Sequence, residues 1–350
     1  MQNKINNSGN FFKKILDKIV YSIYSFFRKN SRVLVALVFL ILVSYPVINK
    51  IVEVSKNKVF FDPNASNRRP DLKPLQLDKF NLGVSDTDQD FKKRRDLDFE
   101  NTFVLWEDNT EQKDIKKGIE KSLNNGRRPI ITIEPWQLFG DNDRTHINNI
   151  VTGKYDQVIK NTCKAIGLYN EFMIVNWGPE PDLAKGYTRY SWAIENSNLY
   201  QQAYQRFHKK CKEESNKIIF MWTANGNEKT KNYYPGDPYV DILGLTIIQT
   251  EIKPDKKAEI EKEATNLLNT KLSRVNGINK IVYLMNYGIK STEEKQKIWI
   301  DNTFDNLKDP NYNKIRGLVY FQAESALNSE ASTDKTNFKI KNELLPIIIN

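Results

Sequence analysis

Carboxylate, amide and indole side chains recur at the ends of apolar segments in this sequence. Glu180 ends FMIVNWGPE, Asn286 follows the apolar run IVYLM, and Glu134 and Trp136 lie at the end of PIITIEPW. A carboxyl group can transfer a proton, while aromatic faces stack on sugar rings and amides bind sugar hydroxyl groups. The sequence contains no GxGxxG motif and no P-loop motif. The pattern therefore favours a carbohydrate ligand over a phosphate or a nicotinamide.

Short apolar, β-branched or aromatic segments alternate with helical segments through most of the chain. This alternation is typical of repeated βα units, and eight such strands close a (β/α)8 TIM barrel. The site of such a barrel lies at the C-terminal ends of its strands, which would bring these polar and aromatic side chains together. The predicted strands are 81–85, 103–108, 129–136, 172–180, 218–225, 240–248, 280–288 and 315–324. The predicted helices are 91–99, 114–125, 155–166, 197–215, 257–275, 292–307 and 338–345.

Positive charge is concentrated at the N-terminal end of the chain. Residues 1–60 carry +8 of the net charge of +10, so the remaining residues are nearly balanced. A basic surface on the barrel would suggest a nucleic-acid partner, and this distribution argues against one. We therefore expect no nucleic-acid ligand.

An uncharged apolar run extends from Val33 to Asn49. It predicts a single transmembrane helix over residues 33–50, an uncleaved anchor rather than a signal peptide, because no small-residue cleavage site follows it. The seven basic residues before it place residues 1–32 in the cytoplasm. This basic amphipathic segment would lie on the inner leaflet or pack on a partner membrane protein.

The remaining residues divide into a linker at 51–79 and the barrel domain at 80–350. We expect the protein in the bacterial inner (plasma) membrane, with the barrel domain periplasmic or extracellular. Cys163 and Cys211 fall in predicted helices. We predict two unpaired core thiols, with a disulfide as the alternative, because the sequence does not give their distance. No metal-site spacing is present, and we expect neither a metal nor a cofactor.

The order of the motifs resembles glycoside hydrolase family 26, which includes β-mannanases, over residues 80–325. The resemblance is carried by ITIEPW, FMIVNWGPE, FMWTANGN and YYPGDPYVDILGLT in that order. Enzymes of this family hydrolyse β-glycosidic bonds with retention, using one Glu after the fourth strand and another after the seventh. The resemblance implies that Glu180 is the acid/base and that Asn286 occupies the nucleophile position. Pro179 also departs from the family, in which His usually precedes the acid/base.

Further strand-end and loop residues are candidates for substrate contact. For the tryptophans, packing within the barrel rim is the alternative, and Glu324 is either a carboxylate replacing the nucleophile or a loop charge. These candidates are Glu134, Trp136, Trp177, Tyr187, Trp192, Trp222, Asn225, Tyr234 and Glu324.

Two functions fit this set of residues. A neutral amide cannot form the glycosyl ester, and retention requires two carboxyl groups about 5–5.5 Å apart. The first hypothesis is a membrane-anchored glycoside hydrolase-like protein acting on an extracytoplasmic β-linked polysaccharide. It would invert, with a carboxylate such as Glu324 activating water, or use a substrate acetamido group oriented by Asn286. The second is a polysaccharide-binding or scaffold protein that assists exopolysaccharide synthesis or export, with a membrane polysaccharide synthase as its candidate partner.

Overall fold

The computed structural model describes residues 72–106, 112–136, 145–169, 171–183, 190–250, 252–323 and 337–346. The predicted cytoplasmic segment and membrane span, residues 1–32 and 33–50, lie outside the described residues. Within the described ranges, no helix has both the length and the apolar character needed to cross a membrane.

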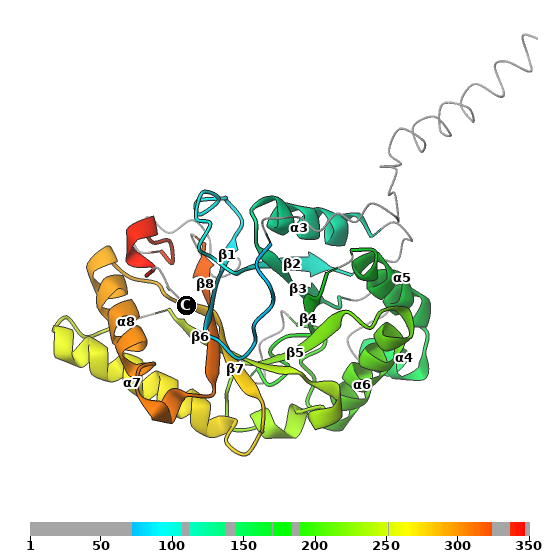
Figure 1. Cartoon of the computed structure of the whole chain (residues 1–350). Helices are drawn as coiled ribbons and strands as arrows, with labels where there is room; N and C mark the ends of the chain where they lie inside the picture. Colours follow the sequence, from blue (N-terminus) through cyan, green and yellow to red (C-terminus); the bar gives the residue numbers. More distant parts are fainter. Residues whose placement is uncertain are drawn as a thin grey trace, which may run out of the picture. The chain divides into compact units, whose positions relative to one another are not determined.

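Eight parallel strands form a closed barrel in sequence order (Figure 1). This confirms the predicted (β/α)8 barrel, and each strand overlaps its predicted range. Strand β2 differs most, since it begins at Phe99 and ends at Leu105. The strands are β1 (Asn81–Asp86), β2 (Phe99–Leu105), β3 (Arg128–Glu134), β4 (Met173–Trp177), β5 (Ile218–Ala224), β6 (Ile242–Gln249), β7 (Ile281–Ile289) and β8 (Ile315–Gln322).

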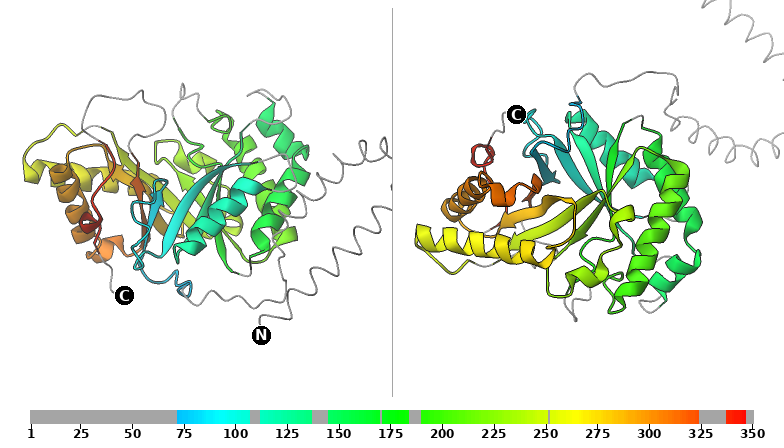
Figure 2. Two further views of the ribbon diagram at one scale, coloured as in Figure 1. Left: turned by 90° about the horizontal axis from the view of Figure 1, so that it is seen from above. Right: turned by 60° about the horizontal axis from the view of Figure 1, so that its bottom comes forward.

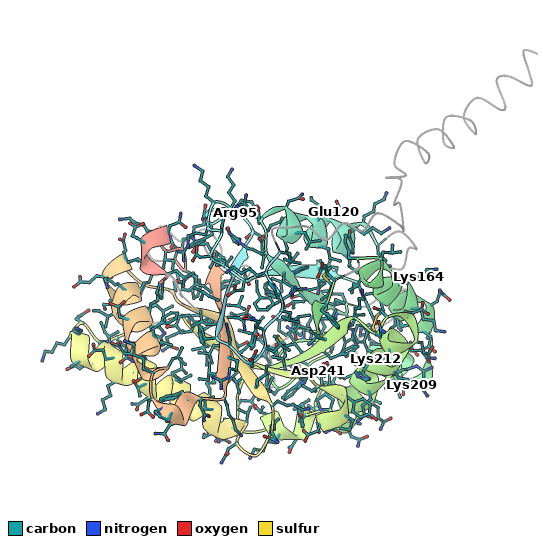
Figure 3. All side chains as sticks on the ribbon, viewed as in Figure 1. Arg95, Glu120, Lys164, Lys209, Lys212 and Asp241 are labelled. Atoms are coloured by element: carbon teal, nitrogen blue, oxygen red, sulfur yellow. A yellow bond between two sulfur atoms is a disulfide. The ribbon has the colours of Figure 1, made fainter. Side chains whose placement is uncertain are left out.

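Helices surround the strands, as Figure 2 shows from two further directions. Charged side chains such as Lys164 and Lys209 point outward from this helix layer (Figure 3). The described α-helices are α3 (Lys113–Asn124), α4 (His146–Thr152), α5 (Asp156–Gly167), α6 (Ser197–Glu214), α7 (Lys257–Arg274) and α8 (Glu293–Asn306). Short 3-10 helices are η2 (Thr230–Tyr233), η3 (Asp237–Tyr239), η4 (Pro310–Tyr312) and η5 (Asn342–Leu344).

Two helix predictions were wrong, and α4 was not predicted. Residues 91–99 form turns and the start of β2, because the buried carboxylate of Asp86 accepts the backbone N–H groups of Asp90 at 3.0 Å and Phe91 at 2.8 Å. These bonds fix the backbone just after β1 and leave the next residues without a helical turn. Of the predicted helix at 338–345, the structure contains only η5.

The N-terminal half of the barrel interior is an apolar cluster. Its buried members are Phe99, Ile130, Ile174, Met221, Ile242, Tyr283, Met285 and Val319. Leu75 and Leu77 pack against this cluster. Residues 72–79, which we predicted as the end of the linker, therefore already pack against the barrel.

A hydrogen-bonded polar layer lies above the apolar cluster, on the inner face of β1 to β4. Asn101 donates to Ser85 at 2.9 Å and accepts from the hydroxyl of Thr132 at 2.6 Å. Asn176 donates to the same hydroxyl at 3.2 Å. These hydrogen bonds lower the desolvation penalty of burying the polar side chains, although the amide oxygen of Asn176 has no partner among the described groups. Above them the strands end, and we call this C-terminal end the barrel mouth.

Cys163 on α5 and Cys211 on α6 form a disulfide, and their Cα atoms are 5.1 Å apart. The prediction of two unpaired thiols was therefore wrong. Both cysteines are fully buried where α5 and α6 pack against each other, so the helix layer brings together two residues that are 48 positions apart. Disulfides of this kind persist mainly in oxidising compartments.

Candidate functional site

Glu180 lies in a tight turn that follows β4. Gly178 donates its N–H to Ile133 on β3 at 3.0 Å, whereas Glu180 donates its N–H to Thr223 on β5 at 2.8 Å. The backbone thus changes its hydrogen-bond partner strand within two residues. Gly178 and Glu180 both have a φ of 55°, a left-handed conformation that is unfavourable for a residue with a side chain. Such strain persists where the surroundings hold it, often at functional sites.

Two aromatic side chains hold this turn, one from the loop before α6 and one from α6 itself. The indole of Trp192 donates to the carbonyl of Pro179 at 2.8 Å, and the hydroxyl of Tyr200 donates to the carbonyl of Gly178 at 2.8 Å. Both rings are fully buried. Pro179 is therefore part of the support for Glu180.

The Glu180 side chain is buried at 8% exposure and reaches toward β6. The hydroxyl of Thr246 on β6 donates a hydrogen bond to Glu180 Oε1. Thr246 was not among the sequence candidates, although its position near the end of a predicted strand was a usable signal.

Asn286 lies in a bulge of β7. Met285 pairs with Thr246 on β6 and Gly288 pairs with Ile248, so β7 contains one residue more than β6 over this stretch. The register with β8 shifts over the same residues. Asn286 has a φ of 47°, and bulges commonly redirect a side chain beside an active site. The pairing places Asn286 directly after the neighbour of Thr246, on the same side of the mouth as the Glu180 carboxyl group.

The amide oxygen of Asn286 is buried, and none of the described groups donates a hydrogen bond to it. A buried acceptor without a donor costs free energy, on the order of 1–3 kcal/mol. A ligand with an N–H or O–H group at this position would remove that cost.

The loop after β5 is held by Asp182, a buried carboxylate that the sequence candidates missed. It accepts the backbone N–H groups of Asn225, Gly226 and Asn227 at 2.7, 2.9 and 3.3 Å, and also the hydroxyl of Thr230. The side chain of Asp182, two residues after Glu180, thus fixes the loop after β5 at the mouth.

Lys271 on α7 also binds this loop, through the backbone carbonyl and the side-chain oxygen of Asn225, the latter at 3.0 Å. Burial lowers the pKa of Lys271, while the charges of Glu180 and Asp182 act in the opposite direction. Asn225 was predicted to bind sugar, but its side-chain oxygen points toward Lys271 in the helix layer.

The indoles of Trp177, Trp192 and Trp222 are buried, with exposures of 1% or less. Trp177 stacks on Phe207 of α6 with ring centroids 5.2 Å apart. Asn176 faces the interior, and successive residues of a strand point to opposite faces, so Trp177 faces the helices. The described contacts of these indoles are those of packing, the alternative that the sequence left open.

Trp222 and Tyr234 contact each other in the same helix layer. Their ring centroids are 5.3 Å apart, and the Tyr234 hydroxyl donates to Asp237 at 2.7 Å. The described contacts of Tyr234 are thus with the connection between β5 and β6 rather than with the mouth.

Glu134 and Trp136 do lie at the mouth. Glu134 shares the inward face of β3 with Ile130 and Thr132, and the half-buried Trp136 donates its indole N–H to Glu134 Oε2 at 3.1 Å. Tyr187 and Glu324 lie outside the described residues. In the described part of the chain, no three His, Cys, Asp or Glu side chains gather as metal ligands.

The sequence matches the family model described as glycosyl hydrolase family 26 over residues 183–330. No curated protein gives a significant match to the chain.

Solved structures share the fold at low sequence identity. GH26C from Muricauda sp. is 16% identical with a TM-score of 0.53, and the alignment covers 70% of this chain and 80% of that one. A modular endo-β-1,4-mannanase from Cellulomonas fimi is 12% identical with a TM-score of 0.53, covering 75% and 69%. Cel5A from Thermotoga maritima, solved with mannotriose, is 11% identical with a TM-score of 0.51, covering 77% and 97%.

Proposed function

From the premise that this chain is a barrel like those of glycoside hydrolase family 26, we propose that it acts on an extracytoplasmic β-linked polysaccharide. Glu180 is the acid/base of the proposed reaction, and Asn286 binds the substrate from the position where the family has its nucleophile. The observation that carries the proposal is that both residues adopt left-handed conformations at the mouth, on either side of Thr246.

The chemistry follows from what these two side chains can do. Glu180 gives a proton to the leaving oxygen and takes one from water, whereas Asn286 cannot bond to the sugar carbon. A substrate acetamido group offers a route that fits Asn286, because its N–H would donate to the amide oxygen. Its carbonyl oxygen would bond to C1 as the leaving oxygen departs with the proton of Glu180. Water would then attack C1 and give a proton to Glu180, while the bond from C1 to the acetamido oxygen breaks and restores the acetamido group.

An inverting reaction is the other route. It requires a second carboxylate about 6.5–9.5 Å from Glu180 to activate water. Glu324, named from the sequence for this role, lies outside the described residues. Asn286 favours the acetamido route, because the described structure leaves its oxygen without a donor.

We also propose a membrane-anchored protein with its barrel outside the cytoplasm. The uncharged run from Val33 to Asn49 and the basic residues before it support the anchor and its orientation. The disulfide between Cys163 and Cys211 supports an oxidising compartment for the barrel.

A second function, binding without turnover, is favoured by the same Asn286. A chain that keeps the barrel mouth and lacks the nucleophile is suited to hold or guide a nascent polysaccharide beside a membrane synthase. In that case Glu180 would contact the sugar without transferring a proton to the glycosidic bond.

Incubation of the detergent-solubilised full chain with mannan, β-glucan and N-acetylhexosamine polymers separates the two functions. Product formation that disappears in Glu180→Gln supports the hydrolase, and formation with amino-sugar polymers alone supports the acetamido route. Binding without product supports the scaffold. Absence of both binding and product on all three polymers would rule out the proposal.

A further inference from the structure

Phe103 and Leu105 occupy the inward face of β2 at its C-terminal end. On the same face, Phe99 belongs to the apolar interior cluster and Asn101 to the polar layer above it. Val104 instead packs in the cluster between the strands and the helices. Since side chains alternate along a strand, Phe103 and Leu105 point into the barrel mouth.

Both side chains are exposed there, Phe103 at 36% and Leu105 at 51%. The reason is that β1 pairs with β2 only through Phe99 and Glu100, so the last residues of β2 extend beyond the ladder. The other large apolar side chains exposed in the described chain, Leu168 and Phe172, precede β4 at the opposite end of the barrel.

The barrel mouth therefore has two chemically different sides. In a closed barrel of eight strands, β2 lies opposite β6, and Thr246 on β6 holds the Glu180 carboxyl group. An apolar surface thus faces a proton donor across the mouth. A pyranose ring has matching surfaces, because its C–H groups present an apolar face while its oxygens point outward from the ring.

We propose that Phe103, with Leu105 beside it, binds the C–H face of one pyranose ring of the β-linked polysaccharide. This contact orients the chain so that its oxygens face Glu180 and Asn286. Phe103 is then a specificity-determining residue that selects rings with a continuous C–H face. The inference rests on the proposed function, since it assumes a sugar chain in the mouth.

The experiment is calorimetric titration of the full chain in detergent with β-manno-, β-gluco- and N-acetyl-chito-hexasaccharides. The Phe103→Ala variant should bind the ligand of the wild type about tenfold or more weakly, because an aromatic surface is no longer buried against the ring. Phe103→Tyr should keep the affinity within about threefold, since the ring remains. Leu105→Asn, which changes the more exposed side chain of the two, should also weaken binding.

Phe172→Ala is the matched control, because it removes an exposed phenylalanine from the other end of the barrel. It should bind like the wild type. Equal affinities for wild type, Phe103→Ala and Leu105→Asn would overturn the inference and leave the proposed function standing. If the wild type binds none of the three ligands, both are overturned. Thermal unfolding of each variant checks that it is folded.

Discussion

The hydroxyl of Thr246 on β6 donates a hydrogen bond to the carboxylate of Glu180, whose backbone follows β4. The side chain of Glu180 therefore crosses above β5 to reach its partner two strands away. This bond contributes to fixing the direction of the carboxyl group in the mouth. In the proposed reaction, a fixed orientation would keep the carboxyl group of Glu180 near the bond that breaks.

The substitution Thr246→Val removes this hydroxyl with little change in shape. We expect turnover, or oligosaccharide affinity if the protein only binds, to fall by roughly 10- to 100-fold, since a net hydrogen bond to a charged group contributes about 1.5–3 kcal/mol. Thr223→Val is the control on the neighbouring strand, because the Thr223 hydroxyl is buried and has no partner among the described groups. Equal effects of the two substitutions would show that Thr246 does not position Glu180.

Asp182→Asn should destabilise the fold. The carboxylate accepts three backbone N–H groups and one hydroxyl in a buried site. The NH2 group of an asparagine would instead face some of these N–H and O–H donors and could not accept from them. We expect a loss of about 2–4 kcal/mol in the free energy of unfolding, measured with urea. Asp237→Asn changes an exposed carboxylate and should stay within about 0.5 kcal/mol. A stability unchanged in Asp182→Asn would contradict the role of this carboxylate.

Asn286→Glu tests whether the missing carboxylate limits turnover. A glutamate in the bulge supplies the second carboxyl group that retention requires, so hydrolysis of the bound oligosaccharide should increase by roughly tenfold or more. Proton NMR of the first product shows whether its anomeric configuration is retained. Asn286→Gln keeps an amide and should not gain activity. Persistent binding without product in Asn286→Glu would show that the mouth lacks more than a nucleophile.

Loss of the disulfide between Cys163 and Cys211 should lower the free energy of unfolding. The pair closes a segment with a sequence separation of 48, for which chain entropy suggests a stabilisation of about 2–4 kcal/mol. The double variant Cys163→Ala, Cys211→Ala should unfold at a correspondingly lower urea concentration. Because the chain has two cysteines, thiol titration of the denatured, unreduced protein should find none. Detection of two thiols would contradict the pairing.

Stability should also fall in mild acid because of His208 on α6. Burial lowers the pKa of His208, and the charge of Lys212 acts in the same direction. The unfolded chain then binds a proton at higher pH than the folded chain. The stabilisation that comes from neutral His208 is therefore present above the ordinary histidine pKa of about 6.5. It is lost as the pH falls through the lower pKa that His208 has in the folded chain. In urea unfolding, His208→Gln should show a smaller decrease in stability from about pH 7.5 to pH 5 than the wild type.

The barrel could be predicted from sequence because each strand is a short β-branched segment bounded by a turn, and because eight such segments close a sheet. The same pattern predicts Glu180 and Asn286 at one end of the barrel, since the C-terminal ends of parallel strands meet there. Their left-handed backbones and the bulge could not be predicted, because they depend on hydrogen bonds to neighbouring strands.

The tryptophans show where sequence reasoning fails. Every residue of β4 is buried, because a parallel strand in a barrel is covered on both faces. The alternation of polar and apolar residues therefore does not reveal which side Trp177 occupies. In the structure Asn176 faces the barrel interior, so its neighbour Trp177 faces the helices. The same limit hid Phe103 and Leu105, whose importance depends on where the ladder between β1 and β2 stops.

The layered interior of the barrel separates the residues that hold the fold from those that would do chemistry. Apolar side chains close the N-terminal half, and paired polar groups lie between them and the mouth. Side chains at the mouth can therefore be exchanged while the lower layers continue to specify the same topology. Selection on turnover can thus relax without selection on folding, and ligand binding can persist as a heritable function of its own.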